Sequence, residues 1–306
     1  MSNLREISSE YLEYCVFSKR LDRKTVRAYR ADLRQLCEEY GGMDIRTVSR
    51  DDIERYIVRL HSHYKPKSVK RKIASAKALF HYIEYRGYID ANPFARVNTS
   101  FREPKVLPRT IPLYIIERIL STVYTSQNDA GTGFRRRNAI RDAALCEMLF
   151  ATGVRISELC GLKPVDINMQ DGYILIYGKG AKERRIHIGN ADVLKALRRY
   201  MDEFKHEIEN CGYLFVNQSG NRFSDQAVRR MLMYYSGLAG IEQHITPHMF
   251  RHTFATALLE ADVDIRYIQE MLGHSSIHTT EIYTHVAMAK QRDILTNKHP
   301  RNMLNV

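Results

Sequence analysis

The sequence predicts a mainly α-helical protein with one small β-sheet, divided into two domains. Apolar residues recur at helical spacing through most of the 306 residues, which is typical of amphipathic helices packed on a core. The stretch IDANPFARVNTSFREPKVLPRTIP, at residues 89–112, combines prolines with turn residues and interrupts this periodicity, as a linker does. Further on, two segments with the side-chain alternation of β-strands lie on either side of a Gly-rich turn, in GYILIYGKGAKERRIHIG. This pattern indicates a β-hairpin.

These features give the expected division of the chain. We expect a helical N-terminal domain at residues 1–100, a linker at 101–112 and a second domain at 113–306. Two breaks in the periodicity, YGGMD at 40–44 and HYKPKS at 63–68, divide the first domain into about four helices.

The chain is strongly basic. Its 47 Lys and Arg residues exceed its 35 Asp and Glu residues, so the formal net charge is +12 and the sequence pI is about 9.4. This charge favours a polyanionic partner: nucleic acid is the first candidate and an anionic membrane surface is the alternative. The start of the chain, MSNLREISSEYLEYC, has no apolar signal core, and no apolar run approaches the roughly 20 residues of a spanning helix. We therefore expect a soluble, cytoplasmic protein without a membrane partner.

No metal or other cofactor is expected. The cysteines are widely spaced and never form a C-x-x-C pair, so we interpret them as buried thiols; they are Cys15, Cys37, Cys146, Cys160 and Cys211. A metal-dependent hydrolase is an alternative suggested by His244, His248, His252, His274, His278 and His285. However, Pro247 interrupts the first three, no carboxylate stands at ligand spacing from them, and Arg251 would repel a cation.

Two predicted helices of the first domain carry basic faces. SKRLDRKTVRAYRADLRQL surrounds an apolar stripe with basic residues, and KPKSVKRKIASAKALFHYIEYRG repeats this pattern. Charged faces are ordinary on solvated amphipathic helices, but neutralisation of phosphates drives association with DNA whatever its sequence. We therefore interpret both helices as DNA-binding candidates. The candidate residues are Arg23, Lys24, Arg27, Arg30, Lys67, Lys70, Arg71, Lys72 and Lys77.

The second domain begins with helical patterns. LYIIERILSTVY predicts a helix, the polar segment TSQNDAGTGFRRRN at 125–138 predicts a loop, and the apolar spacing that follows predicts a buried helix ending near Thr152 and Gly153. Arg155 then opens a new helix beside this apolar wall. An unpaired arginine is costly there, so Arg155 either pairs with an acid such as Glu158 or waits for an anionic ligand.

The hairpin is expected to form part of a three-stranded sheet. Lys179 lies at its tip between Gly178 and Gly180. A solvated turn lysine is the simpler interpretation. The alternative is that the flexible glycine backbone carries the ammonium group into a neighbouring phosphate site.

The segment at residues 246–286, TPHMFRHTFATALLEADVDIRYIQEMLGHSSIHTTEIYTHV, holds polar residues among apolar helix positions. A helix that begins at Pro247 places His248 and Arg251 on one face, where they can share a ligand. We expect Gly273 to end the next helix, directly before His274, and Tyr283 to lie on a helix that begins near Ser276. Each residue alone has a structural explanation, but together they indicate a site.

These motifs carry a family resemblance. ATGVRISEL contains Arg155, GKGAKERR contains Lys179, HMFRH contains His248 and Arg251, and LGHSSIHTTEIYTHV contains His274 and Tyr283. In this order they resemble the tyrosine site-specific recombinases of the phage-integrase and Xer type, over almost the whole chain. The tail NKHPRNMLNV also resembles Xer-type C-termini. Where many relatives have a proline after the hairpin, this chain has His187, which we expect to alter a strand edge and not the chemistry.

The resemblance implies a fold and a chemistry. The first domain would be a SAM-like four-helix core-binding domain, and the second the catalytic domain, with helices around a three-stranded sheet. Tyr283 would attack the scissile phosphate and form a 3′-phosphotyrosyl enzyme, without metal or ATP. Arg155 and Arg251 would clamp the non-bridging oxygens. The remaining implied roles are proton donation to the leaving 5′-oxygen by Lys179, proton transfer at the tyrosine by His248, a phosphate hydrogen bond from His274 and support of Arg155 by Glu158.

The resemblance also implies partners. Two duplex core sites would be exchanged through a Holliday junction by a homo-tetramer, or by a hetero-tetramer with a second recombinase. Residues 287–306 are expected to dock on a neighbouring protomer in trans; the alternative is that they fold back on their own domain. The biological role stays open between resolution of chromosome or plasmid dimers and integration or excision of a mobile element.

Two other functions are weighed against recombination. A type IB topoisomerase would use similar chemistry to relax DNA as a monomer, but the separate helical domain and the Xer-like tail argue against it. A protein that only binds DNA would have a damaged motif, whereas every expected catalytic position is filled here.

Overall fold

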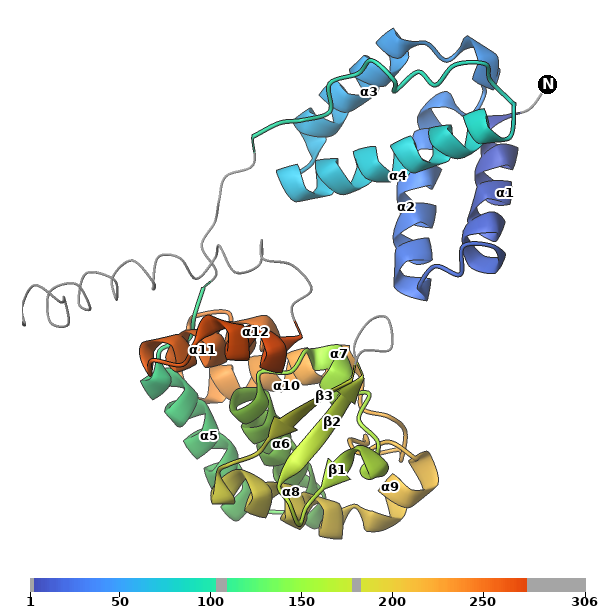
Figure 1. Cartoon of the computed structure of the whole chain (residues 1–306). Coiled ribbons are helices and arrows are strands. Elements are labelled where there is room, and N and C mark those ends of the chain that lie inside the picture. The colour runs from blue at the N-terminus through green and yellow to red at the C-terminus, as the bar shows by residue number, and fades with distance from the viewer. Residues whose placement is uncertain (1–2, 103–108, 178–182, 274–306) are drawn as a thin grey trace, which may run out of the picture. The chain divides into compact units, whose positions relative to one another are not determined.

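The structure is a computed structural model that describes residues 3–102, 109–177 and 183–273. The chain divides between Val106 and Leu107 into two compact units, each with its own hydrophobic core (Figure 1). Ile111, near the end of the stretch expected as a linker, is buried in the second core, and its backbone N–H donates to Thr253 Oγ1 at 2.7 Å.

The N-terminal unit is a bundle of helices. Residues 3–102 contain α1 (Leu4–Phe17), α2 (Arg23–Tyr40), the short 3-10 helix η1 (Ile45–Thr47), α3 (Arg50–His63) and α4 (Pro66–Tyr85). The side chains of Asn3, Asp22 and Ser49 accept hydrogen bonds from backbone N–H groups in the first turns of α1, α2 and α3. Both predicted breaks separate helices, so the four-helix prediction is confirmed for this part of the chain.

A buried carboxylate joins α2 to α4. Asp32 is 1% exposed and accepts hydrogen bonds from Lys72 Nζ at 3.2 Å and Ser75 Oγ at 3.0 Å, and it also pairs with Arg71. The Lys72 ammonium lies 4.4 Å from the centroid of the Tyr64 ring. Lys72 is only 4% exposed, so the prediction that it contacts DNA is wrong: its side chain faces the core, where its charge balances that of Asp32.

We expect Asp32→Ala to destabilise the chain by about 3–5 kcal/mol, because it leaves the buried Lys72 ammonium without its carboxylate. Denaturant unfolding of the full-length protein measures this loss. The double variant Asp32→Ala, Lys72→Met removes both charges and should recover much of the stability. As a control, Glu54→Ala breaks an exposed pair with Arg50 and should cost less than about 1 kcal/mol. Equal losses for Asp32→Ala and Glu54→Ala would contradict this account.

The second unit is mainly helical. Over residues 109–177 and 183–273 its helices are α5 (Leu113–Asn128), α6 (Gly133–Thr152), α7 (Ile156–Leu159), η2 (Pro164–Asp166), α8 (Ala191–Glu203), α9 (Lys205–Cys211), α10 (Asp225–Leu238), α11 (Pro247–Glu260) and α12 (Ile265–Leu272). The central helix is α6, which packs against α5, α8 and α11 and is buried without interruption from Ala139 to Leu149. Its last turn therefore lies at a fixed position from which the site is built.

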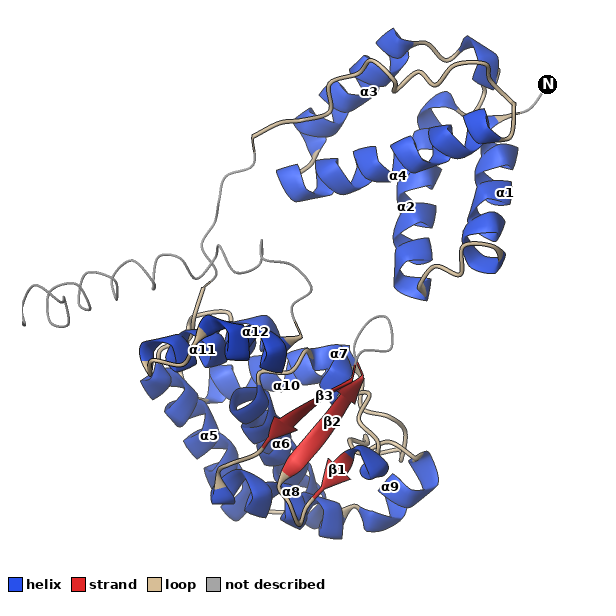
Figure 2. Cartoon of the chain, viewed as in Figure 1, coloured by secondary structure: helices blue, strands red, loops and turns tan. Residues whose placement is uncertain are grey.

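A three-stranded antiparallel sheet lies beside these helices (Figure 2). It runs in the order β1 (Ile167–Asn168), β2 (Tyr173–Tyr177) and β3 (Glu183–His187), and Ile174 pairs with Ile186. Ile174, Ile176 and Ile186 are buried in the core, whereas the alternate positions of β3 are exposed. The predicted sheet is confirmed. His187 ends β3 opposite Tyr173, with ring centroids 6.0 Å apart.

Two expectations about the second unit are wrong. Most of the loop expected at residues 125–138 is helix: α5 continues to Asn128, and α6 begins at Gly133 with the Thr132 side chain accepting from the Arg135 N–H. Most of these polar residues are exposed or half-buried on the two helices, although Gln127 is buried, and composition alone does not distinguish such helix ends from a loop. Cys211 is partly exposed, whereas the four other cysteines are buried thiols as predicted.

Candidate active site

The site begins at the end of α6, where the chain turns sharply. Gly153 has a φ of 58°, in the left-handed region that favours glycine at the C-terminal end of a helix. A Cβ at this position would lie 2.4 Å from Cδ1 of Phe254, so the turn also requires the absence of a side chain. This turn places Arg155 at the N-terminal cap of α7, with Val154 buried behind it.

Arg155 pairs with Glu158. The carboxylate accepts the Arg155 backbone N–H at 2.8 Å and the guanidinium Nη1 at 2.8 Å. The Arg155 side chain nevertheless stays 38% exposed, against 10% for that of Glu158. Of the two alternatives that the sequence left open, the ion pair is therefore present, and its geometry still allows an anion to reach the guanidinium.

Glu158 is also held by a second arginine, Arg184 of β3. Arg184 Nη2 donates to one carboxylate oxygen at 2.7 Å, and Nη1 donates to the other at 3.2 Å. Burial raises the pKa of Glu158, but the hydrogen bonds from Arg184 and from the Arg155 backbone N–H outweigh this effect and leave the pKa below its usual value. Glu158 is therefore ionised at neutral pH.

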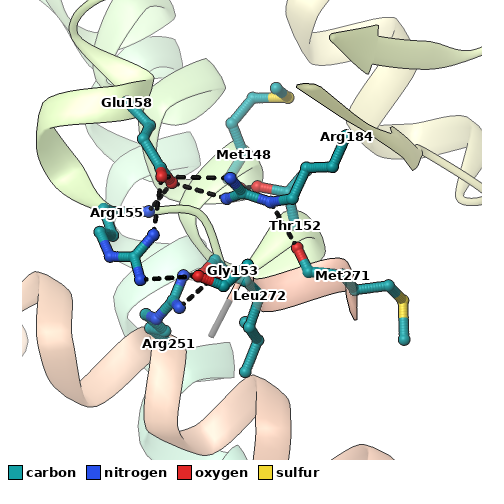
Figure 3. A network of polar contacts seen from close by, with 10 residues as sticks. Met148, Thr152, Gly153, Arg155, Glu158, Arg184, Arg251, Met271 and Leu272 are labelled. Atoms are coloured by element: carbon teal, nitrogen blue, oxygen red, sulfur yellow. Dashed lines mark hydrogen bonds and ion pairs between the residues drawn. The ribbon is translucent and has the colours of Figure 1, made fainter. Parts of the chain in front are cut away.

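The C-terminal end of α12 lies against these arginines (Figure 3). The last carbonyl groups of a helix have no partner within it and carry partial negative charge, so cations stabilise them. Three consecutive carbonyls each accept a hydrogen bond from a different arginine: Met271 from Arg184 Nε at 2.7 Å, Leu272 from Arg251 Nη2 at 2.7 Å, and Gly273 from Arg155 Nη2 at 3.1 Å. Arg155 and Arg251, from segments almost a hundred residues apart, thus meet at one helix end.

Arg251 connects two helix ends. Its Nη1 donates to the Gly153 carbonyl at 2.9 Å, beyond the end of α6, while Nη2 donates to Leu272 at the end of α12. Arg251 is 6% exposed. A buried guanidinium with such fixed partners has little conformational freedom, so its position is set before any ligand arrives.

His248 precedes Arg251 by one helical turn on α11 and is exposed. Partial desolvation of its ring lowers the pKa of His248, and the positive charges of Arg251, Arg229 and Arg155 lower it further. The ring is therefore neutral at pH 7, so it can accept a proton.

We expect His248 to titrate below its usual value of 6.5. Because the pKa is lowered, the neutral ring persists as the pH falls through 6.5 and is lost only at lower pH. An NMR titration of the histidine ring protons measures this directly, and the signal missing from His248→Gln assigns the residue. A midpoint at or above 6.5 would show that neither the partial desolvation of the ring nor the neighbouring arginine charges lower the pKa of His248.

The structure brings together four of the residues singled out from the sequence and leaves others outside its description. Arg155, Glu158 and Arg251 meet between the start of α7 and the end of α12. His248 lies one turn before Arg251 on α11, close enough for the charges of Arg251 and Arg155 to lower its pKa. Lys179, His274 and Tyr283 lie outside the described residues, as does the tail at 287–306.

Sequence reasoning missed the part played by Arg184. A signal was present: Arg184 shares the inward face of β3 with the buried Ile186, and an arginine on an apolar strand face needs a buried acid. The partner, Glu158, is 26 residues earlier in the chain, so it could not be identified without the fold.

The basic candidates of the N-terminal unit lie on α2 and α4, which pack against each other. Lys77 is half-buried and donates to Thr99 Oγ1 at 2.8 Å. The other candidates besides Lys72 are exposed: Arg23, Lys24, Arg27, Arg30, Lys67, Lys70 and Arg71. The unit therefore presents basic side chains from both helices to solvent.

Two properties of the described part of the chain bear on the metal and membrane alternatives. Residues 3–102, 109–177 and 183–273 contain no group of three or more His, Cys, Asp or Glu side chains able to hold a metal ion. Of the histidines considered as ligands, His274, His278 and His285 lie outside this part. In the same residues, every helix is too short or too polar to span a bilayer.

Comparisons with known proteins agree with this architecture. The phage integrase family matches residues 116–290, and the N-terminal SAM-like domain of phage integrases matches residues 9–87. A tyrosine recombinase of Agathobacter rectalis is 59% identical over 301 residues, 98% of each chain. Tyrosine recombinase XerD of Listeria innocua is 34% identical over 97% of this chain and all of its own length. The structure of XerH recombinase in a post-cleavage complex with its palindromic difH substrate has a TM-score of 0.76 at 21% identity, covering 95% of this chain and 84% of XerH.

A SAM-like helical unit, followed by a helical unit with a small sheet and clustered arginines, defines an integrase-type enzyme. The chain belongs to the phage integrase family and is a tyrosine recombinase.

Proposed function

We propose that the chain is a site-specific recombinase that breaks and rejoins duplex DNA through a 3′-phosphotyrosyl intermediate. The observation that carries this proposal is the meeting of Arg155 and Arg251 at the end of α12. Guanidinium groups stay charged at all physiological pH values and match the geometry of phosphate oxygens. Two of them at one place form a site for a single phosphate group and for the extra charge of its transition state.

In the proposed cleavage step, the oxygen of Tyr283 attacks the scissile phosphorus. The bond from phosphorus to the 5′-oxygen breaks, and the phosphate stays on tyrosine through its 3′ side. A phenol has a pKa of about 10, so the attack needs a proton acceptor or cationic surroundings. We assign the acceptor role to His248, because its lowered pKa leaves it neutral at pH 7.

Two further roles complete the step. Lys179 gives a proton to the leaving 5′-oxygen, and His274 donates a hydrogen bond to a phosphate oxygen; both assignments rest on the motifs GKGAKERR and LGHSSIHTTEIYTHV. Glu158 supports Arg155, with which it pairs at 2.8 Å. The phosphotyrosyl bond conserves the energy of the broken linkage, so a 5′-hydroxyl from another strand can reverse the attack without ATP.

Strand exchange requires two duplexes and several protomers. We propose that four copies, or two copies each of this chain and a second recombinase, assemble on two core sites in the cytoplasm and pass through a Holliday junction. Structures of relatives support this: one is a lambda integrase tetramer bound to a Holliday junction. Residues 287–306 would dock on the neighbouring protomer, and α2 and α4 of the N-terminal unit would contact DNA phosphates.

The test is covalent capture on DNA. Duplexes selected from a random library by binding to the full-length protein would be nicked near the cleavage position, so that the short end is lost after attack. Without added metal, we expect a protease-sensitive protein–DNA adduct on a denaturing gel. Unnicked pairs of the same sites should give recombinant junctions, whereas relaxation of a supercoiled plasmid without junctions would favour the topoisomerase alternative. Tight binding without an adduct would overturn the proposal.

A further inference from the structure

We propose that Arg184 is a positioning residue for DNA cleavage: it fixes Arg155 through Glu158 and at the same time fixes the end of α12. This inference deepens the proposed covalent cleavage and rests on it. Arg184 lies on β3. It is not one of the residues proposed above to contact phosphate directly, which include Arg155 and Arg251.

Arg184 is committed to partners within the protein. Its side chain is 9% exposed, and all three nitrogens donate to acceptors: Nε to the Met271 carbonyl, and Nη1 and Nη2 to the two oxygens of Glu158. Gly273 lies close against it, since a Cβ there would come within 3.0 Å of Arg184 Nη1. Every side-chain nitrogen of Arg184 therefore already has an acceptor within the protein, and we assign its effect to these partners and not to direct contact with phosphate.

The first partner is Glu158, which Arg184 holds in a two-pronged ion pair. A two-pronged pair fixes the plane of the carboxylate as well as its position. Glu158 in turn holds both the backbone N–H and Nη1 of Arg155. A carboxylate with little rotational freedom therefore sets the direction of the Arg155 guanidinium.

The charges of Arg155, Glu158 and Arg184 also support a positioning role for Arg184. Arg155 and Glu158 alone form a neutral pair, and Glu158 would compete with a phosphate for the Arg155 guanidinium. Arg184 gives Glu158 a second cation, so the Arg155–Glu158–Arg184 group keeps one net positive charge. A neighbouring cation also weakens the hold of Glu158 on Arg155, which leaves more of the Arg155 charge available to an incoming anion.

The second partner is the end of α12. Arg184 binds the carbonyl of Met271, directly before the Leu272 and Gly273 carbonyls that Arg251 and Arg155 bind. One side chain thus fixes both the acid that directs Arg155 and the helix end at which Arg155 and Arg251 meet. Loss of Arg184 would loosen both contacts together.

The test compares Arg184→Gln and Arg184→Lys with wild type in single-turnover cleavage of the nicked duplex at saturating full-length protein. We expect Arg184→Gln to slow cleavage by about 10- to 100-fold, the same order as the loss that follows removal of a hydrogen-bonded partner that orients a metal ligand. DNA affinity should change by less than about threefold, because Arg184 does not reach the phosphates. Arg184→Lys keeps the positive charge but loses the planar guanidinium that donates to two acceptors at once. Its cleavage rate should therefore lie between those of Arg184→Gln and wild type.

A double-mutant cycle separates positioning from general destabilisation. If Arg184 acts through Arg155, the slowing by Arg184→Gln should be smaller in an Arg155→Lys background than in wild type, because the arginine that it directs is already gone. Arg137→Met is the matched control. Arg137 also pairs with acids, Glu203 and Glu207, and donates to a carbonyl, but it lies near the other end of α6; its loss should leave cleavage unchanged.

The outcomes distinguish this inference from the proposed function. Wild-type cleavage with an unchanged rate for Arg184→Gln overturns the role of Arg184 and leaves the recombinase chemistry intact. Equal slowing by Arg184→Gln in the wild-type and Arg155→Lys backgrounds also overturns it, since the effect would then not pass through Arg155. The absence of any wild-type adduct overturns the proposed function and this inference together.

Discussion

Replacing Tyr283 with Phe is expected to abolish covalent attachment to DNA while leaving DNA affinity within about twofold of wild type. The change removes one oxygen, the proposed nucleophile, and retains the ring, so shape and charge are nearly conserved. No other group on the protein is expected to substitute at a detectable rate, because attack requires in-line placement behind the phosphate. The adduct assay on nicked duplexes and a binding titration of the same duplexes measure the two properties.

Tyr267→Phe is the matched control for this substitution. Tyr267 lies on α12, before the arginine-bound end, and is 64% exposed, so it is an accessible tyrosine that precedes Tyr283 in the sequence. Tyr267→Phe should form the adduct at the wild-type rate. An adduct that survives in Tyr283→Phe, or that disappears in Tyr267→Phe, would contradict the assignment of the nucleophile.

Replacing Arg251 with Ala is expected to slow cleavage by about 1000-fold or more, with a moderate loss of stability. A preorganised donor to a developing phosphate charge typically supplies effects of this size or larger. The same change leaves the carbonyls of Gly153 and Leu272 without the hydrogen bonds seen here, so the free energy of unfolding should fall by about 1–3 kcal/mol. Single-turnover cleavage and denaturant unfolding measure the two effects separately.

Two further variants divide the Arg251 effect into its parts. Arg251→Lys keeps a positive charge but cannot donate in parallel to two acceptors, so most of the cleavage defect should remain. Arg137→Ala removes a different arginine that donates to a carbonyl, that of Glu203, and should reduce stability without slowing cleavage of bound DNA. If Arg137→Ala slows cleavage as much as Arg251→Ala, the defect reflects destabilisation and not loss of a phosphate ligand.

Local patterns in the sequence were enough to predict much of this fold. The helices of the N-terminal unit, the end of α6 at Thr152 and Gly153, and the hairpin of β2 and β3 all follow from periodicity, caps and glycine positions. Such signals are set by neighbours within a few residues, so they can be recognised in one dimension. The expected loop at 125–138 failed for the same reason: its polar residues are compatible with either a loop or the exposed turns of two helices.

Long-range pairing could not be predicted in the same way. In the sequence Lys72 belongs to a basic helix face, but in the fold it is buried and its ammonium group pairs with Asp32, 40 residues earlier. Glu158 was expected to support Arg155, and the two are in fact paired. The position of Arg184 on an apolar strand face indicates a buried acid partner but does not identify it as Glu158. That three arginines bind three successive carbonyls at the end of α12 likewise depends on how separate elements pack.

The measurement that tests the central claim most directly is peptide mapping of the wild-type protein–DNA adduct. After digestion with protease and nuclease, mass spectrometry would locate the residue that carries the nucleotide and the end of the strand to which it is linked. The account predicts one modified peptide, from the segment at 274–290, with a phosphodiester between Tyr283 and a 3′-terminal nucleotide. Linkage to another residue, or to a 5′-phosphate, would contradict it.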